Sequence, residues 1–374
     1  MTIARRLPYT VPMRLATLTL TLLGYLLLTG CQPQPAAEQQ MENYLDRLAR
    51  VLRQDWQPFS ADSLSRYRLP ERRDSLYSIA PERIGLLDLL VDVNPCRPLQ
   101  QRVAERNSVL GKVMPWSSRL AYEGELLRAM EQCLGTLSEP DQQPLRNELS
   151  AIAERKRSQL PQVYWNTINT STELASYLRF ADTPLPVQEQ PLDDTAALAA
   201  LQQLTSIGAA LPAQLPPALE QIEQPLQTLQ RSPNGSQLIT ALAQTRHGLQ
   251  QATAMLQAQP GRYLCPMGTP SARSKVLLNV FVLFYAGEIQ PYLAQLQRLG
   301  QPWSESVIAL RAVPGIPSAT AAALDQLAGT PQSLWEQYQA ALKAHTDAWQ
   351  QQLGACQSQP GQAGWEQRDQ HSAD

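Results

Sequence analysis

The sequence predicts an all-α fold, a multi-helix bundle of antiparallel helical hairpins stapled by two disulfides. Ala, Leu and Gln are abundant, aromatic residues make up 6% of the chain, and β-branched residues seldom cluster, which favours helices. Apolar residues recur every three or four positions in most segments, the period of an amphipathic helix. Four cysteines beyond the N-terminal region are available for the disulfides.

The first 30 residues have the pattern of an export signal. They contain three arginines and no acidic residue, and they include an apolar stretch over 15–28. A positively charged start, a short apolar stretch and a small-residue exit are typical of secretory signals. The stretch of 14 residues is shorter than the roughly 20 that a membrane-spanning helix needs. We therefore expect residues 1–30 to be cleaved, whether translation starts at Met1 or at Met13.

The exit of this stretch, residues 28–31 (LTGC), resembles the lipobox of bacterial lipoproteins. By that resemblance the Cys31 thiol receives a diacylglyceryl group, and the new amine is acylated after cleavage, so the chain is anchored by several acyl chains. Gln32 rather than Asp follows, which by resemblance to lipoprotein sorting indicates the inner leaflet of the outer membrane, facing the periplasm. Residues 31–40 are the expected tether. An ordinary cleaved signal and a short membrane anchor are the alternatives.

The charge of the mature chain limits its partners. From Cys31 onward it has 344 residues, and without the three signal arginines it holds 28 basic against 33 acidic residues, a formal charge of −5. This balance argues against nucleic acid as a partner and against charge-driven binding to anionic lipid. The membrane is therefore expected as a partner through the lipid on Cys31.

The mature chain divides into two predicted halves. A 3.6-residue apolar stripe over 38–56 begins an N-terminal helical half, 41–184, which also contains an expected helix over 82–93. Three prolines over 181–192 mark the boundary. Helices with the same stripe fill a C-terminal half, 193–357, and a polar tail expected to be disordered, 358–374, ends the chain.

Spacing predicts the first disulfide. Four cysteines in an oxidising compartment allow three connectivities, and no CxxC motif points to a metal or redox site. A helical hairpin centred between Met114 and Pro115 pairs residues whose numbers sum to 229, and Cys96 and Cys133 meet that condition. The same register pairs apolar residues, Leu99 with Met130 and Val103 with Leu126, and it pairs Arg106 with Glu123.

The second disulfide is expected around the most apolar segment of the mature chain. Residues 276–286 (VLLNVFVLFYA) are too few to span a membrane and predict a central buried helix. Cys265 stands just before this helix, and Cys356 follows in phase on the last predicted helix, 331–355. These positions make Cys265 and Cys356 the second expected pair.

The polar residues of the predicted hairpin are the candidate binding site: Glu105, Arg106, Asn107, Lys112 and Glu123. Arg106 and Glu123 both interrupt apolar stripes, so an interhelical ion pair is the favoured interpretation and a ligand site the alternative. The sequence holds no HExxH, GxSxG, P-loop or GxGxxG motif, so we predict no catalytic residue, metal or cofactor. His345, on an apolar stripe, predicts a hydrogen-bonded core residue, and Glu288 a helix-end residue that reaches solvent.

Several motifs together resemble one known family. They are the lipobox, the segment 104–114 (AERNSVLGKVM), the segment 164–166 (YWN) and the four paired cysteines. They resemble a family of gammaproteobacterial lipoproteins catalogued as domain of unknown function 3080, over most of the mature chain. The resemblance implies a helical lipoprotein and brings no catalytic residue or substrate with it.

Two classes of function follow from these observations. The preferred hypothesis is a non-catalytic envelope lipoprotein that binds a protein partner or envelope component through its helical faces. The alternative is a hydrolase or lipid carrier that acts on peptidoglycan or lipid, with Glu288, His345 or the segment 105–107 at its site. A lipid carrier would need a cavity lined by the helix over 276–286.

Overall fold

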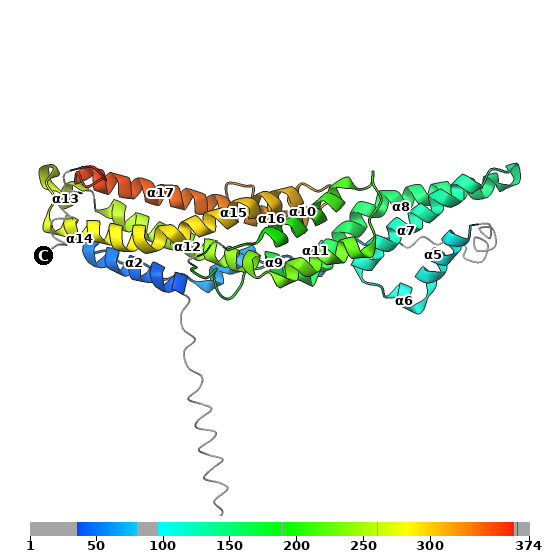
Figure 1. The fold of residues 1–374 in the computed structure, drawn as a ribbon, viewed down its shortest axis with the longest axis horizontal. Helices are drawn as coiled ribbons and strands as arrows, with labels where there is room; N and C mark the ends of the chain where they lie inside the picture. The colour runs from blue at the N-terminus through cyan, green and yellow to red at the C-terminus, as the bar shows by residue number, and fades with distance from the viewer. Residues whose placement is uncertain are drawn as a thin grey trace, which may run out of the picture. The chain divides into compact units, whose positions relative to one another are not determined.

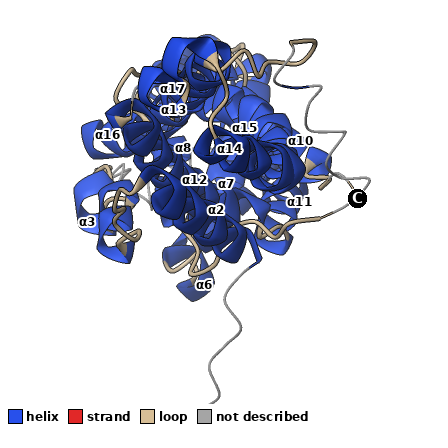
Figure 2. Ribbon diagram, turned by 90° about the vertical axis from the view of Figure 1, so that its left-hand side faces the viewer, coloured by secondary structure: helices blue, strands red, loops and turns tan. Residues whose placement is uncertain are grey.

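The computed structural model describes residues 36–80, 96–188, 190, 192–259, 261–362 and 365. Throughout these residues the regular elements are helices, and no strand occurs among them (Figure 2). The all-α prediction is confirmed. The predicted signal, Cys31 and the expected helix over 82–93 lie outside the described residues. The remainder, from Ala36 onward, forms one compact unit.

The helices follow one another in the order shown by the colours of Figure 1. The first group comprises α2 (Ala36–Leu52), η1 (Ala61–Tyr67), α3 (Arg72–Ser75), α5 (Arg97–Asn107), α6 (Val109–Lys112), α7 (Trp116–Thr136), η2 (Pro140–Gln142), α8 (Gln143–Thr170) and α9 (Thr172–Leu178). The second group comprises α10 (Thr195–Ala210), α11 (Leu219–Arg231), α12 (Asn234–Ala258), α13 (Gly261–Leu264), η3 (Pro266–Gly268), α14 (Ala272–Val280), η4 (Phe281–Ile289), α15 (Gln290–Arg311), α16 (Ser318–Leu327) and α17 (Leu334–Ala355).

Helix α2 begins inside the segment expected to be a tether. Its first turn, 36–40, is composed of Ala, Glu and Gln, all strong helix formers, and Ala37 is already buried. The helix ends at Leu52, four residues before the predicted end, because Arg53 takes a left-handed conformation with φ 53°. The apolar stripe predicted for this helix faces the core as expected.

The predicted hairpin is present, and its register is confirmed by the disulfide. Helix α5 packs against α7, and Cys96 is bonded to Cys133 with a Cα–Cα distance of 5.4 Å. The apolar residues that the register pairs are all buried: Leu99, Val103, Leu126 and Met130. Helix α8 then runs back along α7 (Figure 1).

Helix α8 continues through Pro161 near its centre, although proline ordinarily interrupts a helix. Tyr164, Trp165 and Asn166 are almost fully buried there. Burial of these side chains offsets the hydrogen bond that a proline removes from a helix interior.

Helices from the two predicted halves share one core. Helix α2 packs against α12, α14 and η4, and α12 forms an extensive contact with α17. In Figure 2 these helices are seen close to end-on and lie next to one another. The N-terminal helix is therefore built into the same bundle as the C-terminal helices.

The apolar segment 276–286 is not a fully buried central helix, so that prediction is wrong. It lies in a continuous helix of α14, η4 and α15, in which η4 is a π-helix. One side packs on α2 and the other faces outward, so Val276 is 50% and Leu283 60% exposed. The segment has apolar residues on every side and one strongly polar residue, Asn279, so the sequence pattern alone did not show that only one side would be covered.

Part of the tail expected to be disordered, residues 358–362 and 365, is described by the structure, and the rest of the tail lies outside the described residues. Cys265 is bonded to Cys356 with a Cα–Cα distance of 5.2 Å, which confirms the second predicted pair. Within the expected disordered tail, Ser358 is buried and donates a hydrogen bond to the Cys356 carbonyl. The Trp365 ring lies 6.4 Å from the Phe281 ring. The disulfide and this aromatic contact hold the segment against the bundle.

Candidate functional site

The turn of the α5–α7 hairpin exposes three large aliphatic side chains. Val109 is 81%, Leu110 80% and Val113 74% exposed. All three belong to the segment 108–114, called the hairpin tip below, which contains the short helix α6. Soluble proteins seldom leave such a group of neighbouring aliphatic residues open to water without a binding role.

Local hydrogen bonds fix the conformation of the hairpin tip. The Ser108 backbone ends α5, and the Ser108 hydroxyl caps α6 by accepting a hydrogen bond from the Gly111 N–H at 2.9 Å. Gly111 packs so tightly on α5 that a Cβ atom there would lie 2.1 Å from the Glu105 carbonyl oxygen. This position therefore requires glycine, and the tight packing turns the neighbouring aliphatic side chains outward.

Three of the sequence-predicted site residues support this turn or lie on it. Glu105 forms an ion pair with Arg102 at 2.6 Å, and Asn107 donates a side-chain hydrogen bond to the Val103 carbonyl at 2.9 Å. Lys112 is exposed at the tip itself. The three side chains do not converge on one cavity, so they form a surface rather than a pocket.

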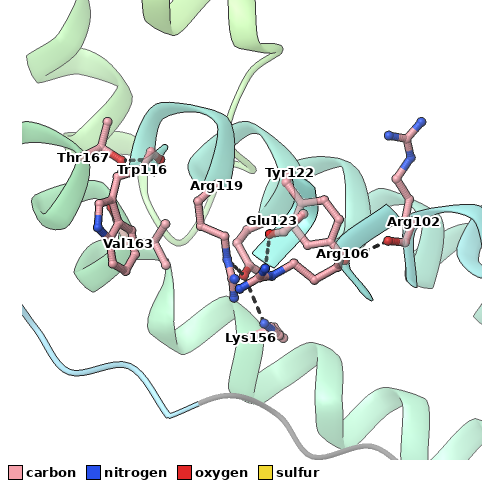
Figure 3. Close-up of polar contacts among 10 residues, drawn as sticks. Arg102, Arg106, Trp116, Arg119, Tyr122, Glu123, Lys156, Val163 and Thr167 are labelled. Carbon is pink, nitrogen blue, oxygen red and sulfur yellow. Dashed lines mark hydrogen bonds and ion pairs between the residues drawn. The ribbon is translucent and has the colours of Figure 1, made fainter. Parts of the chain in front are cut away.

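Glu123, the fifth candidate, lies at the centre of a buried charged cluster beneath the tip. Its Oε1 accepts a hydrogen bond from Arg119 Nε at 2.6 Å and from Lys156 Nζ at 3.1 Å (Figure 3). The Glu123 side chain is 2% and the Lys156 side chain 8% exposed. Among the described residues the other carboxylate oxygen, Oε2, has no hydrogen-bond partner.

The predicted ion pair between Arg106 and Glu123 is not formed, so this part of the hairpin prediction is wrong. Arg106 instead donates a hydrogen bond to the Gly111 carbonyl, and the Glu123 carboxylate forms its ion pairs with Arg119 and Lys156. The Arg106 side chain still points toward the cluster (Figure 3). Burial, followed by the charge of Arg119, lowers the pKa of Arg106. The register is correct, but a closer arginine on the same helix takes the carboxylate.

The cluster carries more positive than negative charge. Arg106, Arg119 and Lys156 surround a single carboxylate, and Tyr122 beside it remains neutral because burial, assisted by the Glu123 charge, raises the pKa of its phenol. The Tyr122 hydroxyl donates to the Arg102 carbonyl at 3.0 Å and so ties α7 to α5. The cluster joins three helices and holds the hairpin on α8.

His345 is a core residue, as predicted, and is distant from the hairpin tip in the fold. Its Nε2 lies 2.9 Å from the Tyr44 hydroxyl, and its Nδ1 lies 3.2 Å from the Thr253 hydroxyl. Burial lowers the pKa of His345 to about 3, so the ring is neutral at physiological pH. Both ring nitrogens already have partners within the bundle, which supports a structural role.

The cavities among the described residues include three with volumes of about 30, 150 and 300 Å³. The largest of the three is lined by residues at the start of α7, directly after the hairpin tip, and by residues of α8 and α11, including Trp116, Thr167 and Glu223. None of the three is lined by Glu288, by His345 or by residues 105–107. Within the described part of the chain, no group of three His, Cys, Asp or Glu residues could hold a metal ion.

Sequence reasoning missed Arg119, Lys156 and the exposed aliphatic residues of the tip. Lys156 follows the buried Ile152 by four positions and precedes the buried Leu160 by four. A charged residue in phase with an apolar stripe is the same signal that singled out Arg106 and Glu123. Lys156 could therefore have been predicted from the sequence in the same way. The exposure of Val109, Leu110 and Val113 depends on the geometry of the hairpin tip, which the pattern does not specify.

Comparison with known proteins places the chain in a family. Comparison with curated proteins and with solved structures found no match. A family model described as a protein of unknown function, DUF3080, matches residues 41–360, which is most of the chain. The matched region contains the hairpin, the Glu123 cluster and both disulfides. The chain belongs to the family of domain of unknown function 3080.

Proposed function

We propose that this protein is a non-catalytic, lipid-anchored envelope protein that binds a protein partner through the hairpin tip. The exposure of Val109, Leu110 and Val113 carries the proposal. Anchoring is proposed from the lipobox-like residues 28–31, as in gammaproteobacterial lipoproteins, with the body facing the periplasm from the inner leaflet of the outer membrane.

The hairpin is built to present its tip rigidly. The disulfide between Cys96 and Cys133 closes one end, and the Glu123 cluster fixes α7 to α8. A preorganised surface loses less conformational entropy on binding than a mobile loop, and exposed aliphatic residues are effective anchors in a partner's pocket. We expect a partner that offers an apolar groove with acidic residues at its rim, because Lys112 stands between the aliphatic residues.

The alternative, a hydrolase or lipid carrier, finds less support. The lipid-carrier hypothesis calls for a cavity lined by 276–286, and the three cavities described above are lined by other residues. The hydrolase hypothesis calls for Glu288, His345 or residues 105–107 in one cleft, and His345 is enclosed by α2, α12 and α17. Binding through an exposed surface fits the geometry better.

Site-specific photocrosslinking in living cells tests the proposal. A photoreactive amino acid replaces Leu110 in the full chain, and the matched control replaces Lys343, which is exposed on α17. We expect one specific protein adduct at 110 and none at 343. The adduct should weaken at least tenfold in Val113→Asp, and Lys112→Glu should reduce it further if the groove has an acidic rim. Identical adduct patterns at 110 and 343 would contradict the proposal.

A further inference from the structure

The outward face of α14 and η4 is apolar where a surface helix ordinarily is polar. Its exposed positions follow helical spacing: Ala272, Val276, Asn279, Leu283, Gly287 and Gln290. Leu283 is 60% and Val276 50% exposed, and Val282 and Phe284 beside them are half-buried. Asn279 is the only polar residue between Val276 and Gly287 on this face. We therefore expect this apolar face to be buried against another surface.

The helix that carries this face belongs to the bundle. Among the described residues, the helix over 272–311 is the one that is long and apolar enough to cross a membrane. Its inner side, however, packs against α2, α12 and α10. Tyr285, for example, lies with its ring 4.9 Å from the His345 ring in the core. A membrane could therefore meet the apolar face along the helix, parallel to its surface, as interfacial helices do.

Charges near the apolar face are complementary to an anionic lipid surface. The chain has no Asp or Glu from position 224 to position 287, although the mature chain as a whole is acidic. Lys275 is exposed at the start of the face. Arg47 of α2 lies over the Phe284 ring at 3.8 Å, at the edge of the face. Apolar and basic residues on one side of a helix are typical of binding to membrane surfaces.

The chain also enters the bundle close to this face. Only four residues separate Cys31 from Ala36, and an extended chain of that length spans at most about 18 Å. Helix α2 begins at Ala36 and runs antiparallel to α14 and η4, since Tyr44 meets Tyr285 and the Val51 carbonyl accepts a hydrogen bond from Arg273. Arg47 is about 17 Å along α2 from its first residue. A lipid on Cys31 would keep the face within reach of the bilayer.

From these observations we infer that the apolar face of α14 and η4 lies on the phospholipid surface to which the chain is anchored. The inference rests on the anchoring part of the proposed function and adds an orientation to it. With this face on the membrane, one side of the bundle always faces the lipid. The acyl anchor and the helix together fix this orientation. The leading competing covers are a second copy of the chain and residues beyond 365, which contain three acidic residues and no aliphatic residue larger than alanine.

An environment-sensitive fluorophore at position 283 tests the inference. The mature lipidated protein is reconstituted in vesicles of phosphatidylethanolamine and phosphatidylglycerol, and Leu283→Cys is labelled with a nitrobenzoxadiazole dye. The introduced thiol is unique, because Cys31 carries the lipid and the other four cysteines are paired. Matched controls are Lys343→Cys on α17 and Val109→Cys on the hairpin tip, both exposed.

We expect a blue shift of the label at 283 on reconstitution and at least twofold stronger quenching by nitroxide-labelled lipid than at 343 or 109. Val276→Glu should at least halve the quenching at 283, while the protein still floats with the vesicles.

Emission at 283 that matches the controls would overturn the inference and leave the anchoring intact. A blue shift without quenching by lipid would mean that protein covers the face, which overturns it as well. A chain that fails to float with the vesicles would overturn both the anchoring and the inference, whereas loss of the hairpin adduct alone would affect only the partner proposal.

Discussion

Lys156 of α8 holds its ammonium nitrogen 3.1 Å from the carboxylate Oε1 of Glu123 on α7, 33 residues earlier in the chain. Both side chains are almost inaccessible to solvent. A buried ion pair of this kind contributes little net stability compared with an apolar pair, but removal of one partner leaves an uncompensated charge. The pair therefore fixes which faces of α7 and α8 meet.

Loss of the carboxylate should be strongly destabilising. Glu123→Gln leaves Lys156 and Arg119 without their counter-charge and is expected to lower the free energy of unfolding by about 3 kcal/mol. Glu123→Leu combined with Lys156→Met should recover most of that loss, because both buried charges disappear. Glu131→Gln is the control, since its pair with Arg157 is largely exposed and is expected to contribute under about 1 kcal/mol. Urea denaturation measures each variant, and a change in Glu123→Gln as small as in the control would contradict the structural role of the cluster.

The two disulfides should contribute similar stability despite their different loops. Cys96 and Cys133 are 37 residues apart, and Cys265 and Cys356 are 91 apart. Loop-closure entropy then predicts losses of about 4 and about 4.6 kcal/mol when each pair is replaced by serine. Denaturation of Cys96→Ser/Cys133→Ser and Cys265→Ser/Cys356→Ser measures them, with thiol titration to confirm that the remaining pair is oxidised. A loss below about 1 kcal/mol for the first pair would mean that the hairpin is held by packing alone.

The sequence predicts the hairpin well because three independent signals agree there. The cysteine spacing, the apolar pairs and the turn at Met114 and Pro115 specify one register, and the structure contains it. The partners of Glu123 could not be predicted as readily. Arg119 lies one turn away on the same helix, and Lys156 lies on α8, outside the hairpin that sets the register. The apolar segment 276–286 shows the opposite case: with Asn279 as its one strongly polar residue, the pattern was not enough to predict which side of the helix remains exposed.

A glycine on α15 should tolerate no side chain. A Cβ atom at Gly300 would lie 2.1 Å from the Trp335 ring, and Trp335 is 3% exposed, so the ring has little room to move. Gly300→Ala is therefore expected to cost about 1–3 kcal/mol of stability. Gly135→Ala on α7 is the matched control, because no atom lies within 4 Å of its added methyl, and it should gain up to about 1 kcal/mol from helix propensity. Thermal denaturation of the two variants should show shifts of opposite sign, and a stabilised Gly300→Ala would refute the tight contact between α15 and α17.

The buried imidazole of His345 should make the fold sensitive to mild acid. Burial lowers the pKa of His345 to about 3, whereas an unfolded chain protonates the same ring near pH 6.5. The unfolded state therefore binds one more proton between these two values, so this contribution to stability is complete above pH 6.5 and falls by up to about 1.4 kcal/mol per pH unit as the pH drops toward 3.

The variant His345→Gln separates that effect from other titrations. It gives up hydrogen bonds to Tyr44 and Thr253, so it should be less stable than the wild type at pH 7.5 by about 1–2 kcal/mol. Between pH 6 and pH 4, however, the stability of the variant should fall by up to about 1.4 kcal/mol less per pH unit than that of the wild type. The two curves of stability against pH should therefore converge. Gln351→Ala, on the exposed side of α17, should keep the wild-type slope. Urea denaturation at several pH values provides the curves, and parallel curves for His345→Gln and the wild type would show that the imidazole is not held neutral by the core.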